Sequence, residues 1–351
     1  MKKKDILNLI RYHVDNNDSS FRDLAYDIAL DFKNNNEDEL CDYILSLLSA
    51  TNTFVPQMYT PNSEYLRKVE LSNKHLYLPS FISDEMKGII NAIGYKAGIN
   101  KFLFQGAPGT GKTESAKHLA RILNRQLLIV DFDNLIDSKL GQTSKNISSL
   151  FSEINTLPYP DQVIILFDEI DSLAMDRTDS RDVREMGRAT SSVLKGFDEL
   201  ADDIVIIATT NLFDKFDKAL IRRFDKVVDF NRYTQDDLLE IAENITEDLL
   251  KRFSFAGRDM RLLKKIISLK TPLPFPGELS NLIKTSIAFS DSRNEYNYLA
   301  CLLKQINASL LSSPSSLKEK GFTLREIEKL TGISKSTLSR ELSKDETWTK
   351  S

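Results

Sequence analysis

The residues with the clearest chemical signature are 106–113, which read Gly-Ala-Pro-Gly-Thr-Gly-Lys-Thr and fit the pattern G-x-x-x-x-G-K-[ST]. Glycines allow the backbone to wrap closely around phosphate oxygens. The loop N–H groups and the positive end of the following helix attract the negative charge. In such a loop Lys112 reaches the β- and γ-phosphates, and the Thr113 hydroxyl binds Mg²⁺. The segment therefore predicts a site for a nucleoside triphosphate with Mg²⁺.

Two acids, Asp168 and Glu169, follow the apolar stretch Val163–Phe167. We expect Asp168 to help hold Mg²⁺. Glu169 is the candidate base that orients and deprotonates the attacking water. Two acids can also do no more than end a strand, but their place after a phosphate loop favours the catalytic interpretation. The residues expected to contact the nucleotide are Gly106, Ala107, Pro108, Gly109, Thr110, Gly111, Lys112, Thr113, Glu114 and Asp168.

An amide and a basic pair complete the candidate catalytic set. Asn211 ends the next apolar stretch, and strand order can bring its amide between the two acids and the γ-phosphate, where it would position the water. Arg222 and Arg223 follow, and a cation is needed where charge builds on the transferred phosphoryl group. A basic pair on a helix is usually a solvated face, but the position of this pair after Asn211 favours a catalytic role.

Apolar stretches that read as strands alternate with helical periodicity from about residue 77 to 232. This alternation is typical of a parallel sheet with helices on both faces, so the predicted fold class is α/β. The predicted strands are 102–105, 126–131, 163–168, 204–209 and 226–230.

The rest of the chain reads as helical units and connectors. Residues 1–50 show three apolar stripes at helical spacing, and residues 51–76 read as a linker. Helical periodicity alone runs through 233–308, which we interpret as a helical lid domain. Ser309–Ser316 reads as a serine-rich hinge before a last helical segment at 317–346.

Over roughly residues 77–300 the chain resembles an AAA+ ATPase. The motifs that carry the resemblance are Gly106–Thr113, Ile165–Asp171, Ala208–Asn211 and Asp217–Asp225. The resemblance implies a P-loop NTPase sheet with a helical lid, ATP and Mg²⁺ as ligands, and ATP hydrolysis. It makes Asp168 and Glu169 the Walker B pair and Asn211 sensor one. It also implies a homo-oligomeric ring, usually a hexamer, in which Arg222 and Arg223 act in trans on the neighbouring subunit's ATP.

Three further segments bear on this resemblance. Leu78–Ile82 is similar to the segment that cups adenine in the family. Lys139 stands where protein-threading members project an aromatic residue into the central pore. A lysine grips unfolded polypeptide less well, but it could meet a phosphate backbone or an acidic partner. Pro276–Ile283 resembles the start of the lid helix and lacks the sensor-two arginine of other branches.

Residues 322–342 resemble a helix-turn-helix. We expect Gly332 to allow the turn and Ser334 to cap the second helix. Glu328 departs from the pattern, which usually has a small residue there. The residues expected to face inward are Leu324, Ile327, Leu330, Leu338 and Leu342, and those expected to face a major groove are Lys335, Ser336, Ser339 and Arg340. The alternative is a helical hairpin that serves assembly or partner docking.

The composition limits which classes of partner and which cellular compartment we expect. The 351 residues carry a formal net charge of −4, which gives no global attraction to nucleic acid or anionic membrane. No apolar run is long enough to span a membrane, and the start does not read as a signal peptide. Cys41 and Cys301 lie far apart and favour reduced thiols, so we expect a cytoplasmic protein.

Two functional hypotheses from different classes follow. The first is an oligomeric ATP-hydrolysing ring that remodels a protein partner. The sequence is similar to bacterial ATPases encoded beside a subtilisin-like serine protease and linked to defence against foreign DNA, which would make a protease the partner. The second is a DNA-bound regulator whose ATP cycle gates assembly through the C-terminal helix-turn-helix. A nucleotide-binding scaffold without turnover conflicts with the joint presence of Glu169, Asn211 and the arginine pair.

Overall fold

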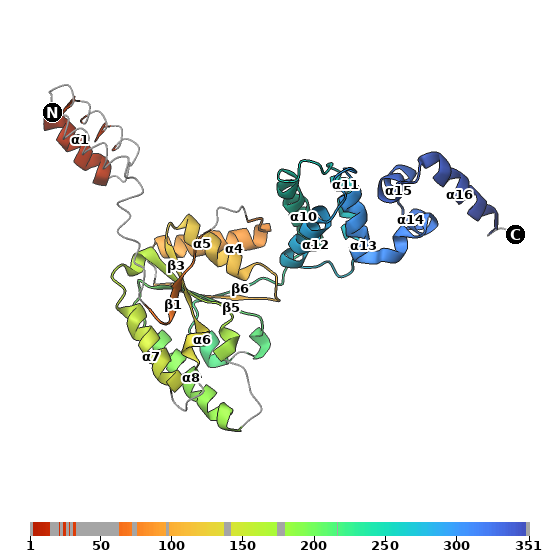
Figure 1. Cartoon of the computed structure of the whole chain (residues 1–351). Coiled ribbons are helices and arrows are strands. Elements are labelled where there is room, and N and C mark those ends of the chain that lie inside the picture. The colour runs from red at the N-terminus through yellow and green to blue at the C-terminus, as the bar shows by residue number, and fades with distance from the viewer. Residues whose placement is uncertain are drawn as a thin grey trace. The chain divides into compact units, whose positions relative to one another are not determined.

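The computed structural model divides the chain into two compact units, Met1–Asn62 and Ser63–Ser351, which we describe separately. In the first unit the helix α1 (Lys3–Val14) confirms the start of the predicted helical segment, and the other helices predicted there lie largely outside the described residues. The structure describes residues 3–14, 21, 24–25, 28, 31–32, 63–71, 76–95, 98–136, 142–173, 180–215 and 217–348 (Figure 1).

The second unit is built on a six-stranded sheet with strand order β1-β3-β4-β5-β2-β6. Five strands run parallel and correspond to the five predicted ones, and β1 pairs antiparallel with β3. β1 was not predicted and lies within the stretch interpreted as a linker. Three residues are too few to show a periodic pattern in the sequence. The strands are β1 (Leu66–Lys68), β2 (Lys101–Gln105), β3 (Gln126–Val130), β4 (Val163–Phe167), β5 (Val205–Thr210) and β6 (Lys226–Asp229).

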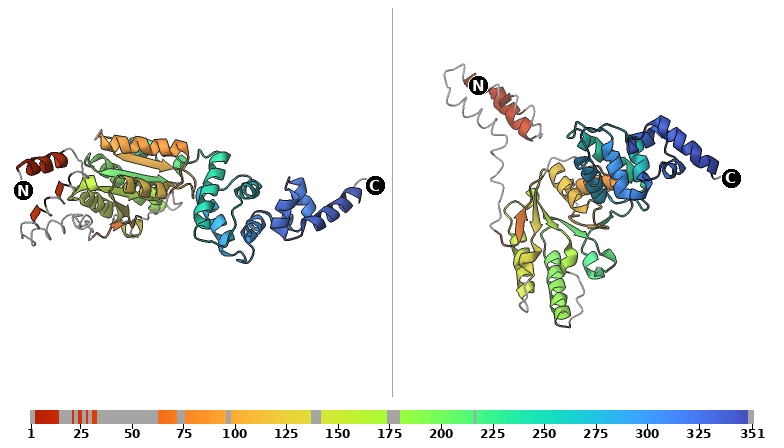
Figure 2. Two further views of the ribbon diagram at one scale, coloured as in Figure 1. Left: turned by 90° about the horizontal axis from the view of Figure 1, so that it is seen from above. Right: turned by 45° about the vertical axis from the view of Figure 1, so that its right-hand side comes forward.

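Helices cover both faces of this sheet, which confirms the α/β fold class (Figures 1 and 2). Alternate strand residues point to opposite faces, so Phe102 and Phe104 pack under α4 (Ser80–Gly94) and α5 (Lys112–Ile122). On the opposite side, Phe167 stacks against Phe151 of α7 (Gln142–Asn155), with ring centroids 6.0 Å apart. Phe197 of α8 (Ser180–Asp198) joins the same aromatic group.

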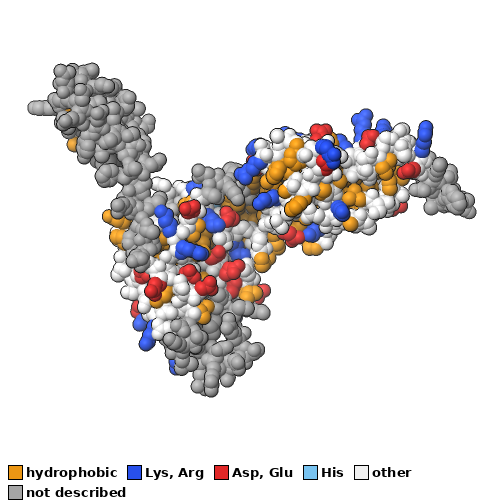
Figure 3. Space-filling model, viewed as in Figure 1, with side chains coloured by type: hydrophobic (Ala, Val, Ile, Leu, Met, Phe, Trp, Pro, Cys, Tyr) orange, Lys and Arg blue, Asp and Glu red, His pale blue; other side chains and the backbone are white. Residues whose placement is uncertain are grey.

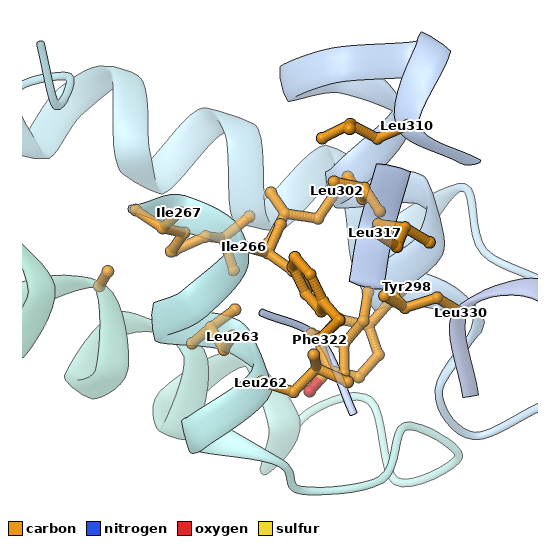
Figure 4. Packing of buried hydrophobic residues seen from close by; sticks show 14 of the residues in the cluster. Leu262, Leu263, Ile266, Ile267, Tyr298, Leu302, Leu310, Leu317, Phe322 and Leu330 are labelled. Atoms are coloured by element: carbon orange, nitrogen blue, oxygen red, sulfur yellow. The ribbon is translucent and has the colours of Figure 1, made fainter. Parts of the chain in front are cut away.

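The helices that follow the sheet in the chain share one hydrophobic core. Lid helices α10 (Gln235–Leu250), α11 (Met260–Ile267), α12 (Pro276–Ala288) and α13 (Asn297–Leu311) are followed by α14 (Pro314–Glu319), α15 (Leu324–Thr331) and α16 (Lys335–Trp348). We call α14–α16 the C-terminal block. Leu317 and Phe322 are buried among side chains of α11 and α13 (Figure 4). Because Leu310 and Leu317 are both buried, the predicted serine hinge is a packed junction.

Two lysines reinforce the junction between the lid and the C-terminal block. The Lys265 ammonium donates to a Glu326 carboxylate oxygen at 2.7 Å and lies 4.5 Å from the Phe322 ring centroid. The Lys329 ammonium donates to Asp259 at 2.6 Å. Burial and partnered charge together hold the block against the lid. Within the part of the chain that is described, no helix has the length and apolar character needed to cross a membrane.

Candidate active site

The phosphate loop leaves the carboxyl end of β2 and enters α5 at Lys112. Gly106 has a φ of 152°, and a Cβ there would stand 2.9 Å from the Phe230 Cβ, so the chain can turn this closely only at a glycine. The predicted strand–loop–helix context is therefore present, with the loop at the carboxyl edge of the sheet.

Two residues that the sequence reasoning missed anchor the loop from the segment after β6. The Ala107 N–H donates to the Asn231 side-chain oxygen at 2.8 Å. The Tyr233 hydroxyl donates to the Thr110 carbonyl oxygen at 2.7 Å, and burial raises the pKa of Tyr233 above its ordinary value. Asn231 and Tyr233 carry no motif, so only their position after a strand that pairs with β2 could have indicated this role.

The Lys112 ammonium lies at the centre of the site and is buried. It donates to the Gly106 carbonyl at 2.6 Å and to the Asn211 side-chain oxygen at 2.8 Å. Burial lowers the pKa of Lys112, and the nearby Asp168, Asp171 and Glu169 carboxylates oppose that effect. A cation held among oxygens at the mouth of a phosphate loop is suited to phosphate oxygens.

The predicted metal ligands are in direct contact. The Thr113 hydroxyl donates to Asp168 Oδ1 at 2.8 Å, and the Thr209 hydroxyl donates to the same oxygen at 2.7 Å. This oxygen-only donor set fits Mg²⁺, which proteins commonly hold by one or two oxygens together with the phosphates of a nucleotide. Thr209 was not predicted, although its position at the end of β5 beside β4 was available from the strand assignment.

Glu169 and Asn211 face each other beside Lys112. The Asn211 amide nitrogen lies 3.4 Å from Glu169 Oε1, while the amide oxygen contacts Lys112. Glu169 has a φ of 54°, which is uncommon for a residue with a side chain, and its N–H donates to the Thr209 hydroxyl at 2.8 Å. The structure thus brings together the candidate base Glu169, the Asn211 amide and Lys112, which the sequence predicted to lie in one site.

A cavity of about 450 Å³ lies between the phosphate loop and the lid. Its size suits a nucleotide-sized ligand. Leu76 and Tyr77 line its apolar end with Ile241 and Ile245. In the segment predicted to cup the base, Leu78–Ile82, α4 begins at Ser80 and Ile82 is buried in the core, while the lining residues Leu76 and Tyr77 lie just before that segment.

The lid reaches the loop through its backbone. The Gly277 N–H, at the start of α12, donates to the Gly109 carbonyl at 2.8 Å. A Cβ on Gly277 would lie 3.0 Å from the Gly109 Cα, so the close approach depends on this glycine. Ser280 of the same helix lines the cavity. The lid therefore forms part of the site although it lacks the sensor-two arginine.

Comparison with known proteins supports the sequence resemblance. The model of the ATPase family associated with various cellular activities (AAA) matches residues 102–232. These residues are an AAA domain.

Curated relatives match parts of the chain of similar length. An uncharacterized AAA family ATPase, y4kL, of Sinorhizobium fredii is 40% identical over 133 residues, which are 38% of this chain and 39% of that protein. Proteasome-activating nucleotidase 2 of Halobacterium salinarum is 36% identical over 149 residues, which are 40% of this chain and 35% of the relative. The chain thus spans about two fifths of the length of these relatives.

A solved structure shows the same fold over a longer stretch. One chain of the structure titled "Structure of E. coli MS115-1 HORMA:CdnC:Trip13 complex" aligns with a TM-score of 0.56 and 16% identity. The alignment covers 70% of this chain and 95% of that one. At this identity the likeness concerns the fold alone.

The two candidate arginines of the AAA domain lie outside the cavity and differ from each other. Arg223 forms a two-pronged contact with Asp198, with N–O distances of 3.0 Å and 3.0 Å, and the Asp198 hydrogen bond raises the pKa of Arg223. Arg222 follows α9 (Lys218–Ile221) and is exposed. The structure therefore makes Arg222 the arginine with the freer guanidinium. Lys139 lies outside the described residues.

The C-terminal block has the turn that the sequence predicted. Gly332 ends α15 with a φ of 73°. The Glu328 carboxylate, which departs from the helix-turn-helix pattern, accepts the Lys335 N–H at 3.0 Å at the start of α16. Burial of the inward-facing residues is confirmed for Ile327, Leu330, Leu338 and Leu342, whereas Leu324 is only partly buried. Lys335, Ser336, Ser339 and Arg340 are exposed.

Proposed function

We propose that this protein binds ATP with Mg²⁺ and hydrolyses ATP to ADP and phosphate. The observation that carries the proposal is the Lys112–Asn211–Glu169 arrangement at the carboxyl edge of the sheet, next to the Thr113–Asp168 pair. The matched AAA family model and the ATPase names of the relatives support it.

Each residue has a distinct part in this mechanism. The backbone N–H groups of the loop and the Lys112 ammonium bind the phosphates, and Thr113 with Asp168 would hold Mg²⁺, which supplies positive charge to the β- and γ-phosphate oxygens. The Glu169 carboxylate accepts a proton from the attacking water. The Asn211 amide lies beside Glu169 and orients that water. Leu76 and Tyr77 provide an apolar surface for the adenine of the nucleotide.

We infer that the protein acts as a homo-oligomeric ring, with a hexamer as the proposed form. Arg222 lies outside its own chain's cavity and is exposed, which supports its proposed action on a neighbouring subunit's ATP. A ring that hydrolyses ATP can remodel a protein bound to it. The name of the proteasome-activating relatives supports a protease as the associated partner.

The test of turnover is the substitution Glu169→Gln, which keeps the hydrogen-bonding shape and removes the base. We expect ATP affinity close to that of the wild type and a fall in kcat of about 10²- to 10⁴-fold. Steady-state phosphate release and binding of a fluorescent ATP analogue measure the two quantities. Glu199→Gln is the matched control, because Glu199 is an exposed acid that pairs with Lys195 and does not line the cavity. Full turnover by Glu169→Gln would refute the assignment.

A DNA-bound regulator is the second candidate, and the exposed Lys335 and Arg340 on α16 favour it. Two observations weigh against strong DNA binding. Glu328 places a carboxylate at the start of α16, and acidic and basic side chains are interspersed on the face shown in Figure 3.

The double substitution Lys335→Glu/Arg340→Glu tests the DNA-bound candidate. It leaves the buried residues of the C-terminal block in place, which a deletion of 317–351 would not. If DNA stimulates the ATPase rate, this candidate predicts that the stimulation falls with salt and disappears in the double variant. An unchanged rate with added duplex DNA would remove the candidate.

A further inference from the structure

Asp171 is a buried carboxylate to which the mechanism above assigns no part. It lies in the short 3₁₀ turn Ile170–Leu173 that follows the Walker B acids, and it is only 7% exposed. Burying a carboxylate is costly unless hydrogen bonds satisfy it. A buried acid three residues after Asp168 therefore needs a structural or a functional explanation.

Both carboxylate oxygens of Asp171 reach across to the end of β5. The Thr210 hydroxyl donates to Oδ1. The Asn211 N–H donates to Oδ2 at 2.8 Å. Thr210 also accepts the Leu212 N–H at 3.1 Å, so the carboxylate and its partner together fix three successive residues at the carboxyl end of the strand.

The backbone position fixed in this way decides where the Asn211 amide lies. From that position its oxygen contacts the Lys112 ammonium at 2.8 Å, and its nitrogen faces the Glu169 carboxylate at 3.4 Å. Asp171 itself does not line the cavity, whereas Asn211, Lys112 and Glu169 do. Asp171 thus acts on the site through Asn211 and not by touching a substrate.

We propose that Asp171 is a positioning residue for ATP hydrolysis: through Thr210 and the Asn211 backbone, it holds the Asn211 amide between the phosphate-binding lysine and the base. This proposal rests on the hydrolysis proposed above. It gives a third acid, which follows the two Walker B acids in the sequence, a supporting part in hydrolysis without contact with the substrate. It also distinguishes Asp171 from a residue that only stabilises the fold, because the two roles predict different kinetics.

The test compares Asp171→Ala with Asp171→Asn in the full chain. Alanine removes both acceptors. The asparagine oxygen can still accept the Asn211 N–H, and its amide can donate to the Thr210 oxygen. We expect Asp171→Ala to lower kcat by about 10- to 100-fold, as a displacement of about 1 Å does in an aligned site. We expect its affinity for ATP to stay near that of the wild type, and Asp171→Asn to recover most of the rate. Asp203→Ala is the control, because Asp203 is an exposed acid just before β5.

Either of two results would overturn the proposal. An unchanged kcat in Asp171→Ala would show that Asn211 needs no such support. Parallel losses of kcat, ATP affinity and thermal stability, with Asp171→Asn no better than Asp171→Ala, would indicate a structural role alone.

Wild type and Glu169→Gln are measured beside these variants, so that an absence of turnover in the wild type counts against the proposed function and not against Asp171. A crystal structure of Asp171→Ala then decides the positioning claim independently of turnover. We expect the Asn211 amide to be displaced from Lys112, and an amide in its original place would refute the proposal.

Discussion

At the scale of single residues, the Lys112 ammonium is the group on which nucleotide affinity should depend most. We expect Lys112→Ala to weaken ATP binding by about 100-fold, because charge-assisted hydrogen bonds of this kind contribute about 1.5–3 kcal/mol each. Binding of a fluorescent ATP analogue measures the effect. Lys117→Ala is the matched control, since Lys117 lies on the same helix and pairs with Glu114. Equal affinities of the two variants would contradict the loop assignment.

Most of the contacts made by these residues could be predicted from the sequence. The phosphate loop is a local motif, and the ends of parallel strands meet at one edge, so Asp168, Glu169 and Asn211 were expected near Lys112. The hydrogen bond from the Asn211 N–H to the Asp171 carboxylate could not be predicted in this way. This bond joins the segment after β4 to the segment after β5, and the spacing of residues in the sequence does not show which side chains meet there.

At the scale of elements, the contact between the lid and the phosphate loop depends on a small residue. A Cβ on Gly277 would lie 3.1 Å from the Gly109 carbonyl oxygen, so Gly277→Ala requires α12 or the loop to shift by a few tenths of an ångström. We expect weaker ATP binding, because the shift displaces a wall of the cavity; overpacking of this kind commonly costs about 1–3 kcal/mol of stability. Gly88→Ala is the control: a Cβ at this position in α4 meets nothing within 4 Å. Isothermal titration with ATP compares them, and an unchanged affinity in Gly277→Ala would exclude the lid from the site.

The junction between α11 and α15 should make the lid sensitive to acid. Burial alone would raise the pKa of Glu326, but hydrogen bonds from Lys265 and Thr323 outweigh it and lower that pKa below its ordinary value of 4.5. Stability from a lowered carboxyl pKa is present above the unfolded value and is lost as the pH falls through the folded one. We therefore expect the free energy of unfolding to fall as the pH drops below about 4.5, and Glu326→Gln to flatten that fall.

Urea unfolding followed by circular dichroism between pH 3 and pH 7 measures this dependence. Glu319→Gln serves as the control, because Glu319 is exposed on the neighbouring helix α14. A Glu326→Gln variant as acid-sensitive as the wild type would show that the pair with Lys265 contributes nothing to the junction.

The arrangement of these elements was only partly visible in the sequence. Apolar stripes indicated helices at 233–308 and 317–346, and those helices are present. The stripes did not show which faces meet, because the partners of Leu317 and Phe322 lie far away along the chain in α11 and α13. The serines before Pro314 suggested a hinge, while the buried Leu310 and Leu317 that flank that segment decide its packing.

At the scale of the whole molecule, the proposed ring makes each site depend on a neighbour. We expect Arg222→Ala to bind ATP normally and to lose about 10³-fold or more in turnover, because an arginine finger contributes that much to the rate. Mixing Arg222→Ala with Glu169→Gln should restore part of the activity. In mixed rings an intact Glu169 in one subunit would meet an intact Arg222 from the next.

Phosphate release from the mixture, at several protein concentrations, tests this arrangement. Arg293→Ala is the control, since Arg293 is another exposed arginine and lies in the lid domain. Two inactive variants that stay inactive when mixed would place the finger elsewhere, and Arg223, which is bound to Asp198 within its own chain, would be tested next.

The short strand β1 also limits how far the protein can be shortened from its N-terminal side. It covers β3, where Leu66 pairs with Val130 and the Val69 N–H donates to the Leu127 carbonyl at 3.0 Å. A chain that began after residue 70 would leave the apolar strand β3 with unpaired N–H and C=O groups, which readily pair with the same edge of another molecule. Such a shortened protein should aggregate, as light scattering would show. Solubility, rather than catalysis, would then set the shortest useful version of this protein.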